Sequence, residues 1–135
     1  MSHAPRRPRF DRRALEPGIV HLGLGAFARA HLAVANDDAI EATGDTRFGI
    51  VGVCLQTARL RDALAPTAGR YVLALRDASG ETRREIGSLL AVLYAPDDPQ
   101  AVLDQLADVA TRVVSLTVTE KGYLGSAPGS TIDLL

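Results

Sequence analysis

The sequence has 135 residues, of which 47% are hydrophobic and 23% charged, and its formal net charge is −1. This composition is typical of a globular domain and excludes a disordered chain, and no apolar run reaches the ~20 residues that a membrane-spanning helix needs. A nearly balanced charge, with no aromatic platform beside the arginines, also argues against a nucleic-acid partner.

Residues 1–17 are expected to form a flexible basic arm. They hold few apolar residues and several arginines, namely Arg6, Arg7, Arg9, Arg12 and Arg13. They lack the apolar core of a secretory signal. Cys54 is the only cysteine, which excludes an intrachain disulfide and favours a cytoplasmic location.

The first predicted elements lie between Gly18 and His31. An apolar run ending near Leu24 predicts a buried strand, two glycines predict a turn, and an alanine-rich pattern predicts a helix over residues 27–42 that Gly44 ends. The spacing Gly23-x-Gly25-x-x-Ala28 fits the fingerprint of a dinucleotide-binding turn. In that fingerprint the small residues let the backbone approach a pyrophosphate at the helix N-terminus.

Further strands and helices alternate along the rest of the chain. We expect strands over residues 48–55, 71–76 and 113–118, a short helix over 57–65, and one or two strand pieces between 82 and 93. Asp98 and Pro99 predict the start of a helix with one buried stripe, formed by Leu103, Leu106, Ala107 and Ala110.

This order predicts an α/β fold, a Rossmann-like and mostly parallel sheet with flanking helices and an inserted β-hairpin. The dinucleotide-binding domain is expected over residues 18–125, and residues 126–135 are expected to form an irregular or truncated tail. Ligands of such sheets lie beyond the carboxyl ends of the strands. The glycine turn and the loop that starts at Thr119 both fall on that edge.

Several stretches, in order, resemble the N-terminal domain of the mannitol dehydrogenase family, the polyol-specific long-chain dehydrogenases. They are Gly23-x-Gly25-x-Phe27-x-Arg29-Ala30-His31, the strand around Gly52, Arg61-Asp62-Ala63-Leu64, Ile86-Gly87-Ser88, Pro96-Asp97-Asp98-Pro99, and residues 114–123 with Thr119-Glu120-Lys121-Gly122-Tyr123. The similarity extends over about residues 18–123.

The resemblance implies an oxidoreductase that exchanges a hydride between NAD and a polyol, ketose or sugar acid, as mannitol 2-dehydrogenases and fructuronate reductases do. It places the catalytic lysine in a helical C-terminal domain, so Lys121 is not expected to be that residue and the chain is expected to be a fragment. A non-catalytic dinucleotide-binding module is the alternative. The cofactor-binding residues expected on these grounds are Ile19, Val20, His21, Leu22, Gly23, Leu24, Gly25, Ala26, Phe27, Ala28, Arg29, Ala30, Thr119 and Glu120.

The sequence departs from the family pattern at two places that bear on the cofactor. Ala28 stands where the family usually has a bulky residue, which brings the turn closer to the plain fingerprint. No acidic residue follows Leu55 to bind a ribose hydroxyl, so NADP is a possible cofactor, with Arg59 or Arg61 pairing with its 2′-phosphate.

Two alternatives stay open at this point. Phe27 lines the cofactor path or anchors the core. Arg29 pairs with an anionic ligand group or with Asp37 or Asp38. His21 and His31 are expected to be structural rather than metal ligands, because no Cys or Glu at the usual spacing completes a metal site.

An exposed apolar face is expected where the C-terminal domain would dock.

Overall fold

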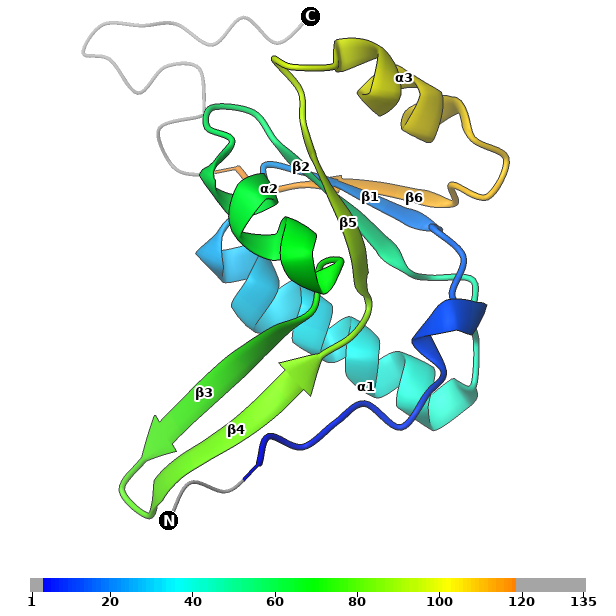
Figure 1. Ribbon diagram of the computed structural model, residues 1–135. Coiled ribbons are helices and arrows are strands. Elements are labelled where there is room, and N and C mark those ends of the chain that lie inside the picture. The colour runs from blue at the N-terminus through cyan, green and yellow to red at the C-terminus, as the bar shows by residue number, and fades with distance from the viewer. Residues whose placement is uncertain (1–3, 119–135) are drawn as a thin grey trace, which may run out of the picture.

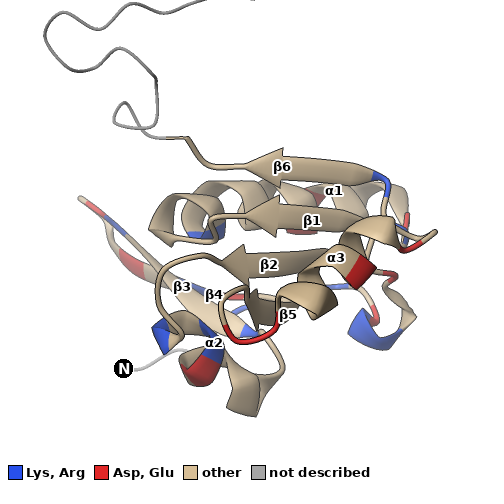
Figure 2. Ribbon diagram, turned by 90° about the horizontal axis from the view of Figure 1, so that it is seen from above, with Lys and Arg blue, Asp and Glu red and all other residues tan. Residues whose placement is uncertain are grey.

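The computed structural model describes residues 4–118, and its centre is a parallel sheet of four strands (Figure 1). The strands are β1 (Ile19–Leu22), β2 (Ile50–Cys54), β5 (Leu89–Tyr94) and β6 (Val113–Leu116), in the spatial order β5-β2-β1-β6. None of these strands carries a charged residue, as Figure 2 shows. Strands that are covered on both faces need such apolar runs. The predicted Rossmann-like sheet is therefore confirmed.

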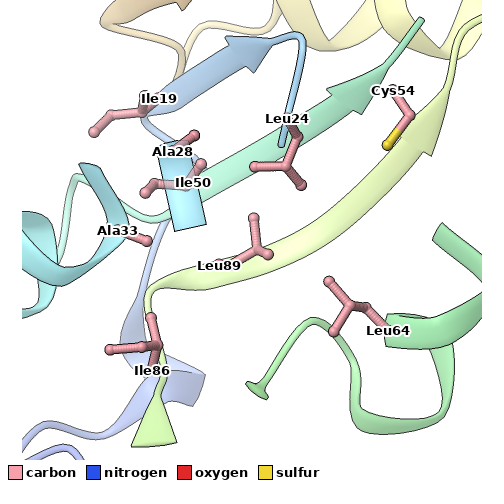
Figure 3. Close-up of a cluster of buried hydrophobic side chains, with 9 residues drawn as sticks. All are labelled: Ile19, Leu24, Ala28, Ala33, Ile50, Cys54, Leu64, Ile86 and Leu89. Carbon is pink, nitrogen blue, oxygen red and sulfur yellow. The ribbon is translucent and has the colours of Figure 1, made fainter. Parts of the chain in front are cut away.

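Helices cover both faces of the sheet. The helix after β1 begins at Ala26, includes a π-helical turn (Ala28–Leu32) and continues as α1 (Ala33–Thr43) to the left-handed Gly44. After β2 come α2 (Arg59–Leu64) and the 3₁₀ turn Ala65–Thr67. Side chains of α1 and α2 pack in one core cluster around Ile50, which Figure 3 shows. On the opposite face α3 (Pro99–Ala107) covers β1 and β2.

The N-terminus of α3 is confirmed, but its predicted buried stripe is wrong. The Asp98 carboxylate accepts a hydrogen bond from the backbone N–H of Ala101 at 3.0 Å, as the sequence predicted for a helix cap. However, Val102 is the buried residue, whereas Leu103 is 57% exposed and Ala107 is also exposed. Only Leu106 of the predicted stripe packs on Val20 and Val53. The helix lies rotated by about one residue from the expected orientation.

The predicted hairpin is present and is separate from the parallel sheet. Strands β3 (Tyr71–Asp77) and β4 (Gly80–Ile86) pair antiparallel, and Figure 1 shows them extending away from the sheet. The region expected to hold one or two strand pieces thus contains two, β4 in the hairpin and β5 in the sheet.

Residues 4–17 differ from the flexible arm that their composition predicts. The backbone of Arg6 pairs with β4, and its guanidinium lies 3.1 Å from the Glu41 carboxylate. The Arg12 guanidinium donates to the backbone carbonyls of Gly87, Ala68 and Leu89. Composition could not reveal these partners, because they are a carboxylate and backbone groups from distant parts of the chain.

A buried carboxylate joins α1 to the connection between β4 and β5. Asp37 is fully buried, and its two oxygens accept the backbone N–H groups of Gly87 at 2.9 Å and Ser88 at 2.8 Å. The Ser88 hydroxyl donates to the carbonyl of Ala33 on the same helix. Burial raises the pKa of Asp37, which the hydrogen bonds partly oppose. The base of the hairpin is thereby held against the helix.

His21 plays a corresponding part between β1 and β6. Its ring is 4% exposed, with Nδ1 2.8 Å from the Ser115 hydroxyl and Nε2 2.9 Å from the Thr117 hydroxyl. Burial lowers the pKa of His21, so the neutral ring is favoured. This confirms the structural role expected for His21.

Apolar side chains remain exposed along β6 and next to it. Val113, Val114, Leu116 and Val118 are each between 44% and 59% exposed. Among the described strands β6 lies at one edge of the sheet. The sequence led us to expect an exposed apolar face, and one is present here.

We expect Asp37→Ala to lower the free energy of unfolding by about 3 kcal/mol, because it leaves two buried N–H groups without acceptors. Urea denaturation of the 135-residue chain measures this loss. The control is Asp38→Ala, which removes an exposed carboxylate paired with Arg84 and should cost roughly 1 kcal/mol or less. Equal losses for the two variants would contradict the role given to Asp37.

We also expect the urea midpoint to fall when the pH is lowered from about 7.5 to about 5.5. Because the pKa of His21 is lower in the folded chain, its contribution is fully present above the unfolded value of 6.5 and is lost as the pH falls toward the folded value. His21→Asn should reduce this pH dependence, and His31→Asn, which changes an exposed ring, should keep it. If the urea midpoint of His21→Asn changed with pH as much as that of wild type, groups other than His21 would cause the pH dependence.

Candidate functional site

A tight backbone turn connects β1 to the following helix. Gly23 has φ +81°, a conformation that residues with a Cβ atom rarely adopt. The N–H groups of Gly23 and Leu24 both donate to the carbonyl of Val53, at 2.9 and 3.0 Å. The chain therefore bends from the end of β1 over the end of β2 before the helix begins at Ala26.

Leu24 fixes this turn by packing where Gly52 has no side chain. A Cβ atom at Gly52 would lie 2.4 Å from Cδ2 of Leu24, closer than two carbon atoms can approach. Leu24 is buried in the same cluster as Ile50 and Cys54. The position of the turn thus depends on a glycine in the neighbouring strand.

The start of the helix faces the carboxyl edge of the sheet. The first turn of any helix leaves backbone N–H groups without partners in the helix and carries the positive end of its dipole. A cavity of about 230 Å³ lies beside the turn, lined by Leu24, Cys54, Leu55, Gln56, Thr57 and Leu60. The site therefore combines donors suited to an anionic group with a cavity that has both polar and apolar walls.

The topology places this turn at the point where the strand order reverses. The chain passes from β1 to β2 on one side, and β6 pairs with the other side of β1. Parallel α/β sheets bind their ligands in the crevice at this point. Fold and local geometry consequently indicate the same site.

Two side chains at the helix start now have defined surroundings. Phe27 is 67% exposed and its ring centroid lies 4.6 Å from that of His31, so Phe27 does not anchor the core. The Nε of Arg29 donates to the carbonyl of Gly25 at 3.2 Å. Among the described residues Arg29 makes no ion pair with Asp37 or Asp38, so that alternative is wrong.

The two arginines after β2 differ in their partners. The Arg61 guanidinium lies 2.6 Å from Asp97 and 3.0 Å from Asp62, and it stacks over the Tyr94 ring. Arg59 is exposed and forms no ion pair within residues 4–118. Of the two candidates for a 2′-phosphate, Arg61 is therefore already neutralised.

The predicted site residues fall into three groups. Ile19, Val20 and His21 are buried in β1, the first two in the core clusters and His21 between the Ser115 and Thr117 hydroxyls, so they support the turn. The residues from Leu22 to Ala30 form the end of β1, the turn and the helix start. Thr119 and Glu120 lie outside the described residues.

Sequence reasoning missed two supports of the site. Gly52 was seen only as part of an apolar strand, although a glycine within a strand often marks a close approach. The Tyr71 hydroxyl donates to the carbonyl of Arg29 at 2.5 Å, within the π-helical turn. Burial raises the pKa of Tyr71, which keeps this donor protonated. Nothing in the sequence around Tyr71 indicates this long-range contact.

Neither a metal site nor a membrane span is found in the described part of the chain. No group of three or more His, Cys, Asp or Glu side chains is placed to hold a metal ion there. None of the described helices is both long and apolar enough to cross a bilayer.

Similar proteins were found at the levels of both sequence and structure. Mannitol 2-dehydrogenase of Pyricularia oryzae is 44% identical over 120 residues, which are 87% of this chain and 24% of that protein. Mannitol 2-dehydrogenase of Aspergillus clavatus is 46% identical over 112 residues, or 82% and 22%. This chain thus spans about a quarter of the length of these relatives.

Among solved structures, Pseudomonas fluorescens mannitol 2-dehydrogenase in ternary complex with NAD and D-mannitol matches with a TM-score of 0.81 and 37% identity. The match covers 88% of this chain and 25% of that one. A substrate-free D-sorbitol dehydrogenase matches with a TM-score of 0.79 and 38% identity, over 87% and 25%. The family model described as the mannitol dehydrogenase Rossmann domain matches residues 17–135. The chain therefore belongs to the mannitol dehydrogenase family, through its Rossmann domain.

Proposed function

We propose that this chain is the NAD-binding domain of an oxidoreductase that interconverts the alcohol and carbonyl groups of polyols, ketoses or sugar acids. The observation that carries the proposal is the glycine turn at the strand-order reversal, on a Rossmann domain whose relatives are mannitol 2-dehydrogenases. NAD, when bound, supplies the hydride acceptor. One of the solved structures that match this chain, that of Pseudomonas fluorescens mannitol 2-dehydrogenase, is a ternary complex with NAD and D-mannitol.

The residues of the turn fit the pyrophosphate of a dinucleotide. A Cβ atom built at Gly25 would meet nothing closer than the Gly23 carbonyl at 3.9 Å, so the backbone here is open to a ligand. The N–H groups of the first helical turn and the Arg29 guanidinium supply positive charge beside it. We assign the contacts with the cofactor to residues 22–30, with Thr119 and Glu120 on the side of the nicotinamide.

The adenosine half of the cofactor fits the cavity beside β2. Leu24, Leu55 and Leu60 provide apolar walls, and Gln56 and Thr57 provide polar groups. Pockets for such ligands are typically apolar with a few polar groups that fix orientation. The proposed path of the dinucleotide thus runs from this cavity across the glycine turn toward β6.

We assign the catalytic groups to a C-terminal domain. The relatives have room for such a domain, because this chain matches only 24% of the Pyricularia oryzae protein and 25% of the solved Pseudomonas fluorescens chain. Lys121, the only lysine of the sequence, lies outside the described residues and belongs to the family segment at residues 119–123. The exposed apolar side chains along β6 support the proposal, because they offer a surface for another domain. We place the protein in the cytoplasm, in agreement with its single cysteine.

The binding proposal is tested by Gly25→Ala. The added methyl group would lie 3.9 Å from the nearest protein atom, so the free energy of unfolding should stay within about 1 kcal/mol of wild type. The same methyl group would block the approach of the pyrophosphate to the backbone. We expect NADH affinity to fall at least about tenfold, measured by the change in NADH fluorescence on titration.

The matched control is Gly44→Ala at the other end of the same helix, where φ is +70°. It should lower stability by about 1 kcal/mol through backbone strain and leave NADH affinity unchanged. The proposal fails if wild type does not bind NADH, or if the two variants change its affinity equally.

The assignment of cofactor binding to this chain and of catalysis to another domain gives a separate prediction. With NADH bound, the 135-residue chain should not oxidise it when D-fructose is added, because the catalytic groups lie in another domain. The absorbance of NADH over time measures this, with a full-length mannitol 2-dehydrogenase as the positive control. Steady oxidation by the purified chain would contradict the assignment of catalysis to a C-terminal domain.

A further inference from the structure

The end of β2 decides what kind of ribose a dinucleotide site accepts. In Rossmann domains a carboxylate there binds the 2′-hydroxyl of NAD and repels a 2′-phosphate, whereas a nearby arginine accommodates that phosphate. In this chain β2 ends at Cys54, and the cavity wall continues through Leu55, Gln56 and Thr57. None of these residues carries a negative charge.

Two acidic side chains, one after β2 and one after β5, are already paired. Asp62 and Asp97 both pair with the Arg61 guanidinium, at 3.0 and 2.6 Å. Arg61 in turn stacks on Tyr94, with its guanidinium carbon 5.4 Å from the ring centroid. With one guanidinium between two carboxylates the cluster keeps a net charge of about −1, so Arg61 is not free to bind a phosphate.

Arg59 is the remaining candidate for a cation that binds the 2′-phosphate. It is exposed, follows the cavity-lining Thr57 by two residues, and has no carboxylate partner within residues 4–118. Arg59 is the first residue of α2, and the segment before that helix is held in place because the Tyr94 hydroxyl donates to the carbonyl of Gln56 at 3.2 Å. A guanidinium can bind a phosphate through two parallel hydrogen bonds.

We infer that the ribose end of this site accepts a 2′-phosphate, with Arg59 as its cation, so that the chain binds NADPH as well as NADH. This inference rests on the proposed function, because it concerns the same dinucleotide site. It adds the residue that sets the choice of cofactor.

Fluorescence titrations of the 135-residue chain with NADH and with NADPH test this inference. For wild type we expect dissociation constants that agree within about tenfold. Arg59→Ala should raise the ratio of the NADPH to the NADH constant by about tenfold, which corresponds to one charge-assisted contact. Added salt should weaken NADPH binding more than NADH binding, because it screens the exposed guanidinium.

Two further variants locate the effect. Arg61→Lys is the matched control, because it keeps the positive charge between Asp62 and Asp97 and should leave the ratio near its wild-type value. Gln56→Glu supplies the missing carboxylate and should raise the ratio at least about tenfold by repelling the 2′-phosphate.

The outcomes separate this inference from the proposed function. Binding of NADH with NADPH more than about a hundredfold weaker would overturn the inference and leave the proposed function intact. A ratio that changes with Arg61→Lys and not with Arg59→Ala would overturn the assignment to Arg59. Failure of wild type to bind either dinucleotide would overturn both.

Discussion

The contact between Leu24 and Gly52 is the constraint on which the candidate site depends. It joins the turn after β1 to the middle of β2, beside the two hydrogen bonds that Gly23 and Leu24 donate to the Val53 carbonyl. The same leucine forms part of the wall of the adjacent cavity. One side chain therefore determines where the backbone donors lie and how the cavity beside them is shaped.

Asp37 holds the other half of the helix. It ties α1 to the residues that lead from the hairpin into β5, so the helix is fixed both at its start, by the turn, and in its middle. A site made mainly of backbone donors needs this support, because it has few side chains that could adjust to a ligand. When such donors are held rigidly before the ligand arrives, less conformational entropy is lost on binding.

The sequence predicted the type and order of the elements well, because each follows from a local pattern. The alternation of apolar strands with helices, the Asp98 cap and the glycine at the end of α1 are all recognisable within a few residues. The position of the glycine turn follows from spacing in the same way, and the resemblance placed it in the Rossmann domain of the mannitol dehydrogenase family.

Features that depend on distant contacts could not be predicted in this way. Residues 4–17 have the composition of a free arm, but carbonyl groups near Gly87 bind Arg12. The stripe of α3 was misplaced because alanine and leucine at neighbouring positions fit more than one face. Arg59 and Arg61 looked equivalent until Asp97, remote in sequence, proved to neutralise one of them.

The π-helical turn at Ala28–Leu32 lets the two ends of one helix face different partners. A π turn accommodates one residue more than an α turn, so it rotates all later residues by about 100° relative to those before it. The residues at the helix start can thus be oriented for a ligand, while Ala33, Asp37 and Ile40 are oriented for the core. Deleting a single residue within this turn would preserve the helix but misalign one of its ends. The two ends can therefore vary separately only while the wide turn between them is kept.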